Sequence, residues 1–320
     1  MRVGFFGTPD IASHMLKRLC REHEVLFLVA PEDKRSGRNL KIAGCSSKGI
    51  AESEDLPVLQ PKSLKNQEFI EELKRFNADI FIVVAYGKLI PETVFTLPRY
   101  GTINLHPSLL PKYRGAAPVE WAIINGENET GVTIQMINEE LDAGDIIIQE
   151  KIQLSSSITA GELYEIVTSI GEELLLKSAE ILSEGRYKPI QQDHSKATYC
   201  GKLERETAFI DWNKSSTEIH NLIRGLNPKP AAWTNFRDMN IKIWKTVEFN
   251  DNEINLKPGQ ILKHNKKQLI VGTGAGILEI LEIQPENKKR MDGLSFINGY
   301  RIDNENFCMK ENLPQSYAEF

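Results

Sequence analysis

The hydrophobic and polar positions of the first 150 residues alternate between strand-like and helix-like patterns. Apolar runs predict strands at 2–6, 24–30, 79–85, 101–105 and 131–137. The run at 79–85 lacks polar positions after Asp79, as in strands that are buried on both faces. Apolar residues at helical spacing predict helices at 11–19, 66–76 and 119–126. This alternation is typical of an α/β fold with an open sheet.

The pattern changes after residue 160. A long amphipathic helix is predicted from 160, and the polar, aperiodic stretch 184–203 is interpreted as a connecting segment. Beyond one short helix at 216–226, short strands are predicted at 242–249, 259–264, 268–273 and 277–284, a spacing that favours a small β-barrel or sandwich. We therefore predict a first domain at 1–189, a linker at 190–208 and a smaller β domain at 209–320.

Charge and cysteine usage narrow the function classes. The net charge is −5, so nucleic acid would have to be bound through local basic clusters, of which 34–41, 263–267 and 288–290 are candidates. Each cluster could equally be an ordinary solvated loop. No apolar run reaches the roughly 20 residues of a membrane span. The four cysteines are widely separated, which favours a reducing cytoplasm and predicts neither disulfides nor a metal site.

Two glycine-containing segments resemble nucleotide-binding loops only superficially. FGTPD at 6–10 follows the first strand but lacks the second and third glycines of a dinucleotide fingerprint, and its proline has no N–H to donate to phosphate. VGTGAG at 271–276 lies between two predicted strands, which favours a hairpin turn. A dinucleotide cofactor is therefore not expected.

The candidate chemistry lies in GTINLHPSLLPKYRG at 101–115. Asn104 and His106 are two residues apart at a strand end, so both side chains project from the same face. Ligands of open α/β sheets bind at this carboxyl edge. Asp142, in a predicted tight turn, supplies a carboxylate where the neighbouring predicted strand passes into a loop. An amide and an imidazole can stabilise an oxyanion while the carboxylate orients the imidazole or relays a proton.

Other interpretations of these residues are open. A histidine at a strand end is often structural, and Asp142 could merely form its turn. Ser108 also permits a Ser-His-Asp arrangement. However, it lies between two prolines without the Gly-x-Ser-x-Gly elbow of that class, so acyl transfer without a serine nucleophile is favoured.

Residues 101–147 resemble the signature region of the 10-formyltetrahydrofolate-dependent formyltransferases. The similarity continues through LPVLQPKSL, VVAYGKLIP, ATYCGKLERETAFIDW, IRGLNPKPAAW and LIVGTGAGILEILEIQPENKKRM, and so covers nearly the whole chain. The resemblance implies a Rossmann-like catalytic domain followed by a smaller OB-like β-barrel domain. It also implies that Asn104, His106 and Asp142 are catalytic and that 10-formyltetrahydrofolate is the cosubstrate, without a metal.

The resemblance further implies which residues bind the two substrates. The folate would contact Tyr86, Gly87, Leu89, Ile90, Ser108, Leu109, Leu110, Pro111, Leu141, Asp142 and Asp145. Within the family the similarity favours enzymes that formylate the free amine of initiator methionyl-tRNA for translation initiation. The tRNA would contact Lys34, Arg35, Arg38, Lys41, Lys288, Lys289 and Arg290, although the loop after Arg38 reads AGCSSKG instead of the family's usual proline-containing continuation. A monomer that binds neither DNA nor membranes is expected.

Three rival functions share parts of this pattern. A sugar-nucleotide formyltransferase would use the same chemistry, but the basic loop at 34–41 and the second domain favour tRNA. A hydrolase that passes the formyl group to water would use the same three residues, although such enzymes usually lack this second domain. A tRNA-binding module with a lapsed catalytic site has no reason to retain Asn104, His106 and Asp142 together.

Overall fold

The computed structural model describes residues 1–36, 41–43, 45–251, 253–302 and 305–309. The chain divides into two compact units. The first contains residues 1–118, 129–153 and 164–201, and the second contains residues 119–128, 154–163 and 202–320. Residues 119–128 and 154–163 therefore cluster with the second unit although they lie inside the range predicted for the first domain. Residues 190–201 of the predicted linker belong to the first unit.

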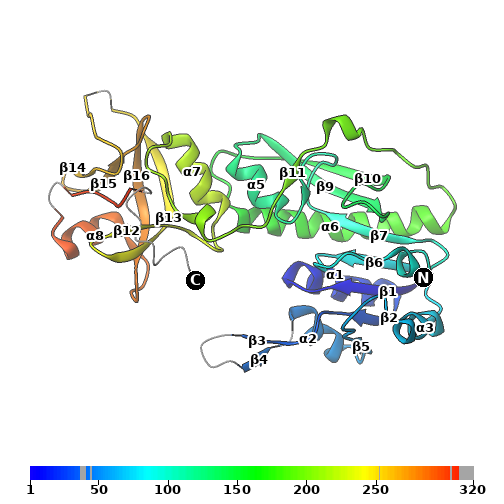
Figure 1. The fold of residues 1–320 in the computed structure, drawn as a ribbon. Coiled ribbons are helices and arrows are strands. Elements are labelled where there is room, and N and C mark those ends of the chain that lie inside the picture. Colours follow the sequence, from blue (N-terminus) through cyan, green and yellow to red (C-terminus); the bar gives the residue numbers. More distant parts are fainter. Residues whose placement is uncertain (37–40, 44, 252, 303–304, 310–320) are drawn as a thin grey trace. The chain divides into compact units, whose positions relative to one another are not determined.

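A seven-stranded mixed sheet forms the centre of the first unit, in the order β10-β9-β7-β6-β1-β2-β5 (Figure 1). The pairs from β5 to β7 are parallel, and β9 and β10 are antiparallel to their neighbours. The strands are β1 (Arg2–Gly7), β2 (Glu24–Val29), β5 (Val58–Leu59), β6 (Ile80–Val84), β7 (Thr102–His106), β9 (Glu129–Met136) and β10 (Ile146–Gln153).

Helices connect the parallel strands, as their crossovers require. They are α1 (Asp10–Glu22), α2 (Ser46–Ser53), α3 (Gln67–Phe76) and α4 (Glu92–Phe95). Two further helices lie outside these crossovers: α5 (Pro118–Ile124), which clusters with the second unit from Val119 on, precedes β9, and α6 (Ala160–Ser183) follows β10. Side chains alternate between the two faces of the sheet. Phe6, Phe27 and Phe81 pack with the apolar side of α3, whereas Gly171 of α6 lies against Leu105 of β7 on the other face. The predicted α/β class is confirmed, and β6 is buried along its whole length.

Several elements of this unit escape the sequence pattern. The sequence pattern indicates no helix or strand between residues 31 and 49, but this stretch contains the strand pair β3 (Lys34–Ser36) and β4 (Lys41–Ala43) and the start of α2. The stretch 184–203 contains the 3-10 turn η1 (His194–Lys196) and β11 (Tyr199–Cys200), and β11 pairs in parallel with β8 (Arg114–Gly115). Strands β8 and β11 are created by hydrogen-bonding partners that are distant in sequence, residues 114–115 and 199–200, rather than by local periodicity.

The second unit is built on an antiparallel sheet in the order β12-β13-β16-β15-β14, with β17 paired to β16. This confirms a smaller C-terminal β domain, and the turn at 273–276 joins β15 to β16 as predicted. Trp212 stacks on Phe307 in its core. The elements are η2 (Glu206–Ala208), α7 (Ser216–Gly225), β12 (Ala232–Phe236), β13 (Met239–Phe249), β14 (Ile261–His264), β15 (Gln268–Gly272), β16 (Ile277–Pro285), β17 (Met291–Asp292) and α8 (Gly293–Tyr300).

Candidate active site

The carboxyl end of β7 carries Asn104 and His106. In the antiparallel pairing with β9, Asn104 lies opposite Gln135 and His106 lies opposite Thr133. Directly opposed residues of such a pair share a face of the sheet. All four side chains therefore lie on one face, as the two-residue spacing of Asn104 and His106 predicts.

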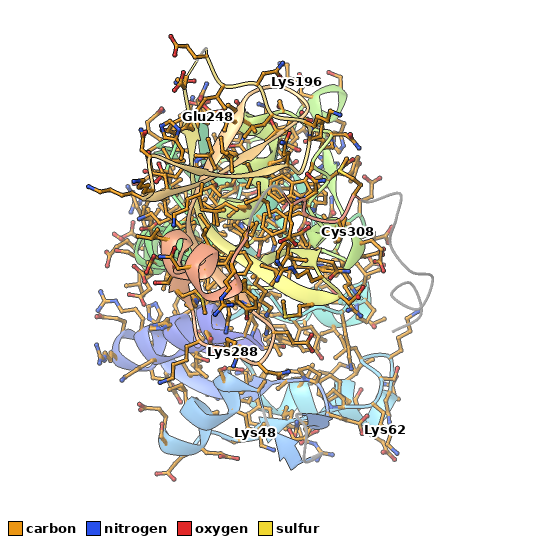
Figure 2. All side chains as sticks on the ribbon, turned by 90° about the vertical axis from the view of Figure 1, so that its left-hand side faces the viewer. Lys48, Lys62, Lys196, Glu248, Lys288 and Cys308 are labelled. Carbon is orange, nitrogen blue, oxygen red and sulfur yellow. The ribbon has the colours of Figure 1, made fainter. Side chains whose placement is uncertain are left out.

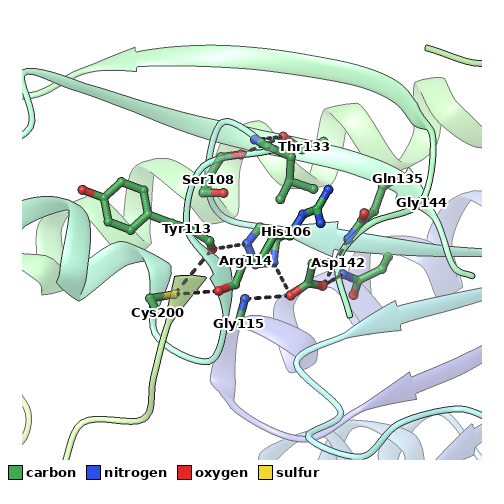
Figure 3. A network of polar contacts seen from close by, with 12 residues as sticks. His106, Ser108, Tyr113, Arg114, Gly115, Thr133, Gln135, Asp142, Gly144 and Cys200 are labelled. Carbon is green, nitrogen blue, oxygen red and sulfur yellow. Dashed lines mark hydrogen bonds and ion pairs between the residues drawn. The ribbon is translucent and has the colours of Figure 1, made fainter. Parts of the chain in front are cut away.

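His106 is buried and has acceptors on both sides of its ring (Figure 3). Its Nε2 lies 2.8 Å from the carbonyl oxygen of Tyr113, and its Nδ1 lies 3.6 Å from Oδ2 of Asp142. A carbonyl oxygen only accepts hydrogen bonds, so Nε2 carries a hydrogen. Nδ1 is consequently the ring nitrogen that faces the carboxylate.

Asp142 lies in the left-handed region, with φ of 51°, in a tight turn after β9, as the sequence predicts. Its Oδ2 accepts a hydrogen bond from the backbone N–H of Gly115 at 2.9 Å. Its Oδ1 accepts from Gln135 Nε2 at 3.1 Å and from Asn104 Nδ2 at 3.5 Å. The structure thus brings the three predicted catalytic residues together around one carboxylate.

Gly115 makes its contact possible because of its backbone conformation. Its φ is 119°, a region that side-chain-bearing residues avoid, and a Cβ there would clash with the carbonyl oxygen of Cys200. The carbonyl of Cys200 also accepts from the N–H of Ala116 at 3.1 Å. The pairing of β8 with β11 therefore fixes the direction of the Gly115 N–H toward Asp142.

The predicted folate-binding residues after β6 divide into buried and exposed positions. Tyr86 and Ile90 lie in the hydrophobic core beneath the loop, and burial raises the pKa of Tyr86 to about 12. Gly87 has φ of 79° and Leu89 is 74% exposed. The surface available to a ligand in this loop therefore includes its backbone at Gly87 and the exposed side chains of Ala85, Lys88 and Leu89.

The loop after β7 is held by backbone contacts. Ser108 is fully buried; its hydroxyl donates to the carbonyl of Lys112 at 2.6 Å, and its carbonyl accepts from Thr133 Oγ1. The amide of Gln149 donates to the carbonyl of Leu110, while Leu109 packs against Gly131. Because His106 points its Nε2 at Tyr113, this geometry offers no support for a serine nucleophile.

The turn at 139–145 completes the predicted folate surface. Leu141 is 51% exposed, and the carbonyl of Asp145 accepts a hydrogen bond from the N–H of Met136. Pro111, in the loop after β7, accepts through its carbonyl from the N–H of Thr198. Exposed apolar side chains beside hydrogen-bonded backbone are compatible with a flat heterocycle, and these residues remain predictions.

Two glutamines at the centre of the site are missing from the sequence-based predictions. Gln135 contacts Asp142 directly, and Gln192 donates from Nε2 to the carbonyl oxygens of Asp142 and Gly144 at 3.0 and 2.7 Å. Gln135 could have been found from its position in a strand neighbouring Asn104. Gln192 lies in the segment interpreted as a linker, where no periodicity marks it.

The predicted tRNA-binding residues are only partly described. Arg38 lies outside the described residues, and Lys34, Arg35 and Lys41 lie in β3 and β4, for which the structure describes the backbone alone. Lys288, labelled in Figure 2, and Lys289 are exposed. The guanidinium of Arg290 lies 3.4 Å from the ring centroid of Trp244, and its Nη1 lies 3.7 Å from Glu282 Oε1.

Within the part of the chain that the structure describes, no helix is long and apolar enough to cross a membrane. Nor do three or more His, Cys, Asp or Glu side chains gather there in a group that could hold a metal ion.

The sequence of the chain matches two family models. The "Formyl transferase" model matches residues 1–178, and "Formyl transferase, C-terminal domain" matches residues 202–301. The fold is similar to the crystal structure of WlaRD, a sugar 3N-formyl transferase in the presence of dTDP and 5-N-formyl-THF. That similarity has a TM-score of 0.66 and 21% identity, and it covers 90% of this chain and 99% of the other. The chain belongs to the formyl transferase family.

Two relatives identify the acceptor class. The methionyl-tRNA formyltransferase of Lachnospira eligens is 41% identical over 308 residues, which are 95% of this chain and 98% of the relative. That of Caldanaerobacter subterraneus subsp. tengcongensis is 43% identical over 306 residues, with 94% and 98% covered. Within the family the chain is a member of the methionyl-tRNA formyltransferases (EC 2.1.2.9), folate-dependent enzymes that formylate Met-tRNA in translation initiation.

Proposed function

We propose that the chain transfers the formyl group of 10-formyltetrahydrofolate to the free amine of initiator methionyl-tRNA by direct attack, with Asn104, His106 and Asp142 as its catalytic residues. The observation that carries this proposal is the convergence of an amide, an imidazole and a carboxylate at the carboxyl edge of β7. The amine forms the new C–N bond, and the bond between the formyl carbon and the folate N10 breaks. The amine loses one proton and N10 gains one.

Asn104 is the most suitable donor to the oxyanion that develops when the amine attacks. Its side chain is partly exposed, and Nδ2 has two hydrogens, of which one faces Asp142 at a long 3.5 Å. The second hydrogen is available to a substrate oxygen. His106 cannot donate from Nε2 unless it releases the carbonyl of Tyr113, so the geometry favours Asn104 for this role.

His106 and Asp142 are suited to moving the proton from the amine to the leaving nitrogen. Nδ1 of His106 and Oδ2 of Asp142 are 3.6 Å apart, and proton-transfer contacts commonly tighten when the substrate binds. The contact of Nε2 with Tyr113 holds the ring in one orientation. The amine is thus deprotonated, and N10 protonated, without a covalent enzyme intermediate.

Binding of the two substrates is proposed on the surfaces described above. The folate ring would lie between the loop after β6 and the turn at 139–145, with Ser108, Leu109, Leu110 and Pro111 shaping the loop beside it. The tRNA would contact the basic segments at 34–41 and 288–290. The exposed Arg290 supports a contact with the second unit, because its guanidinium is held over the Trp244 ring, where it is also 3.7 Å from Glu282.

The test is an acceptor comparison with the purified chain and 10-formyltetrahydrofolate. Initiator Met-tRNA, elongator Met-tRNA, an amino sugar nucleotide and water alone are offered as acceptors, and product formation and folate release are measured separately. We expect formylation of initiator Met-tRNA at a rate far above the other three. Equal formylation of both tRNAs would contradict the initiator assignment, and folate release without tRNA product would indicate a hydrolase.

A further inference from the structure

A chain of buried side chains runs from Arg114 through Gln192 and Gln135 to Asp142. The exposed fractions of Arg114, Gln192 and Gln135 are 1%, 5% and 1%. Arg114 Nη2 donates to Gln192 Oε1 at 2.7 Å, and its Nε donates to the same oxygen at 3.2 Å. Gln192 Nε2 donates to Gln135 Oε1 at 3.2 Å, and Gln135 Nε2 donates to Asp142 Oδ1. Every link therefore points its donor toward the carboxylate.

Arg114 and Asp142, at the two ends of this series of hydrogen bonds, determine the orientation of both glutamine amides. A guanidinium can only donate, so Gln192 must turn its oxygen toward Arg114. An ionised carboxylate can only accept, so Gln135 must turn its NH2 group toward Asp142. The contact between the two glutamines is then a correctly paired donor and acceptor, without any freedom to flip either amide.

The charge distribution indicates that this series of hydrogen bonds stabilises the carboxylate of Asp142. Among the described residues no carboxylate lies within ion-pair distance of Arg114. Its other polar contacts are the Tyr199 hydroxyl and the His194 Nδ1, each at 3.4 Å. A buried cation is costly without a compensating charge, and polarised amides extend its influence toward an anion. The nearest anion along the donor direction is the carboxylate of Asp142.

Gln192 also holds the backbone of the turn that carries Asp142. Its Nε2 also lies 3.0 and 2.7 Å from the carbonyl oxygens of Asp142 and Gly144. The two hydrogens of this NH2 group therefore serve three acceptors, counting Gln135 Oε1 at 3.2 Å, and one hydrogen is shared between two of them. Gly144 is itself packed against the carbonyl of Met136, where a Cβ would clash. The side chain of Gln192 thus ties a left-handed turn to the strand pair that carries Asn104 and Gln135.

We propose that Arg114, Gln192 and Gln135 are positioning residues that act through Asp142, holding its carboxylate in place for the exchange with His106. This inference rests on the proposed catalytic role of Asp142. Because none of the three residues needs to contact the tRNA, their loss should lower kcat and leave the KM for Met-tRNA nearly unchanged. The KM for the folate is not part of this expectation, because Gln192 also holds the turn at 139–145 that is proposed to contact the folate.

The experiment compares Gln192→Met with a matched control, Gln60→Met. Gln60 makes the same type of bridge in the same unit: its Oε1 accepts from Lys48 at 3.2 Å, and its Nε2 donates to the carbonyl of Pro31 at 2.7 Å. Its contacts do not lead to Asp142. Loss of a residue that orients a catalytic group typically lowers activity about 10–100-fold. We expect that loss of kcat for Gln192→Met, with Gln60→Met close to the parent.

A purely structural role is separated from positioning by combining each variant with Asp142→Asn under single-turnover conditions. If Arg114, Gln192 and Gln135 act through Asp142, Gln192→Met lowers kcat about 10–100-fold in the parent and less than about threefold in the Asp142→Asn background. An equal cost in both backgrounds, or unchanged kcat for Gln192→Met, would overturn the proposal. Gln135→Met interrupts the chain one step nearer to Asp142 and must give the same pattern, which provides the test if Gln192→Met unfolds.

The positioning role of Arg114, Gln192 and Gln135 can be refuted independently of the proposed function. Loss of turnover in Asp142→Asn together with an unchanged kcat for Gln192→Met would refute the positioning role alone. Full turnover in Asp142→Asn would refute the catalytic role of Asp142, on which the positioning role rests.

Discussion

Replacing Asp142 with asparagine is the most informative single substitution. It preserves the shape of the side chain and replaces one acceptor oxygen with a donor NH2 group. In the parent, Oδ1 accepts from Asn104 and Gln135, and Oδ2 accepts from the backbone N–H of Gly115 and lies 3.6 Å from Nδ1 of His106. The new NH2 group must take one of these places. Placed at Oδ1 it opposes two amide donors, and placed at Oδ2 it opposes the backbone N–H of Gly115.

The expected loss follows from what His106 would face. With the NH2 group at Oδ2, Nδ1 of His106 can only accept, and Nε2 keeps its hydrogen for Tyr113, so the ring is fixed in its neutral form without a carboxylate to exchange with. Removing a single oxyanion donor costs about 10²–10³ in rate, and an Asp→Asn change that leaves a catalytic histidine in the wrong tautomer costs about 10⁴. We therefore expect kcat to fall by about 10²–10⁴, or about 2.7–5.5 kcal/mol of activation free energy.

The assay measures formyl-Met-tRNA under saturating 10-formyltetrahydrofolate and Met-tRNA, in single-turnover and steady-state modes, beside thermal unfolding. The free energy of unfolding should fall by about 1–3 kcal/mol, since a neutral amide of the same size replaces the carboxylate and its NH2 group opposes a donor. Asp79→Asn is the control: its Oδ2 also accepts from a backbone N–H, that of Arg2 at 2.8 Å, at the opposite end of the sheet. A kcat for Asp142→Asn within tenfold of the parent would refute the reasoning.

Three further substitutions test separate parts of the structure. Asn104→Ala should lower kcat by about 10²–10³ in the same assay while the chain stays folded; turnover near that of the parent would remove Asn104 from the mechanism. Gly115→Ala should destabilise the first unit by about 1–3 kcal/mol, because its φ is strained for alanine and its Cβ meets Cys200, and denaturant unfolding measures this. The pKa of Glu218 is lowered to about 2, first by the hydrogen bond from Lys214, so Glu218 stabilises the second unit above pH 4.5 and loses this effect as the pH falls toward 2. The stability difference between the parent and Glu218→Gln should shrink over that pH range, and a constant difference would contradict this.

Long elements with a clear period could be predicted from the sequence, whereas short elements made by distant pairing could not. The apolar run of β6 and the amphipathic face of α3 follow from the buried surface that each must cover, so local residues specify them. Strands β8 and β11 contain two residues each, and they exist because residues 114–115 meet residues 199–200. No local pattern encodes such a meeting.

The same distinction divides the site. Asn104 and His106 could be predicted because strand geometry places residues two apart on one face, and Asp142 because its turn is marked by the small residues that follow it. Gln192 could not, because its position depends on a polar, aperiodic segment folding back over the turn at 142–144. The contact of Nε2 of His106 with Tyr113 was likewise beyond the sequence, since it requires the left-handed backbone of Tyr113, with φ of 59°.

The pairing of β8 with β11 changes where the catalytic part of the chain can be cut. A fragment that ends at Pro189, where the periodic pattern stops, would lose Gln192 and the strand whose Cys200 carbonyl lies against Gly115. A fragment that ends at Gly201 would retain both. Insertions and fusion points that a loop would tolerate are therefore unsuitable between residues 190 and 200, because this segment contributes Gln192 and the Cys200 carbonyl to the candidate active site.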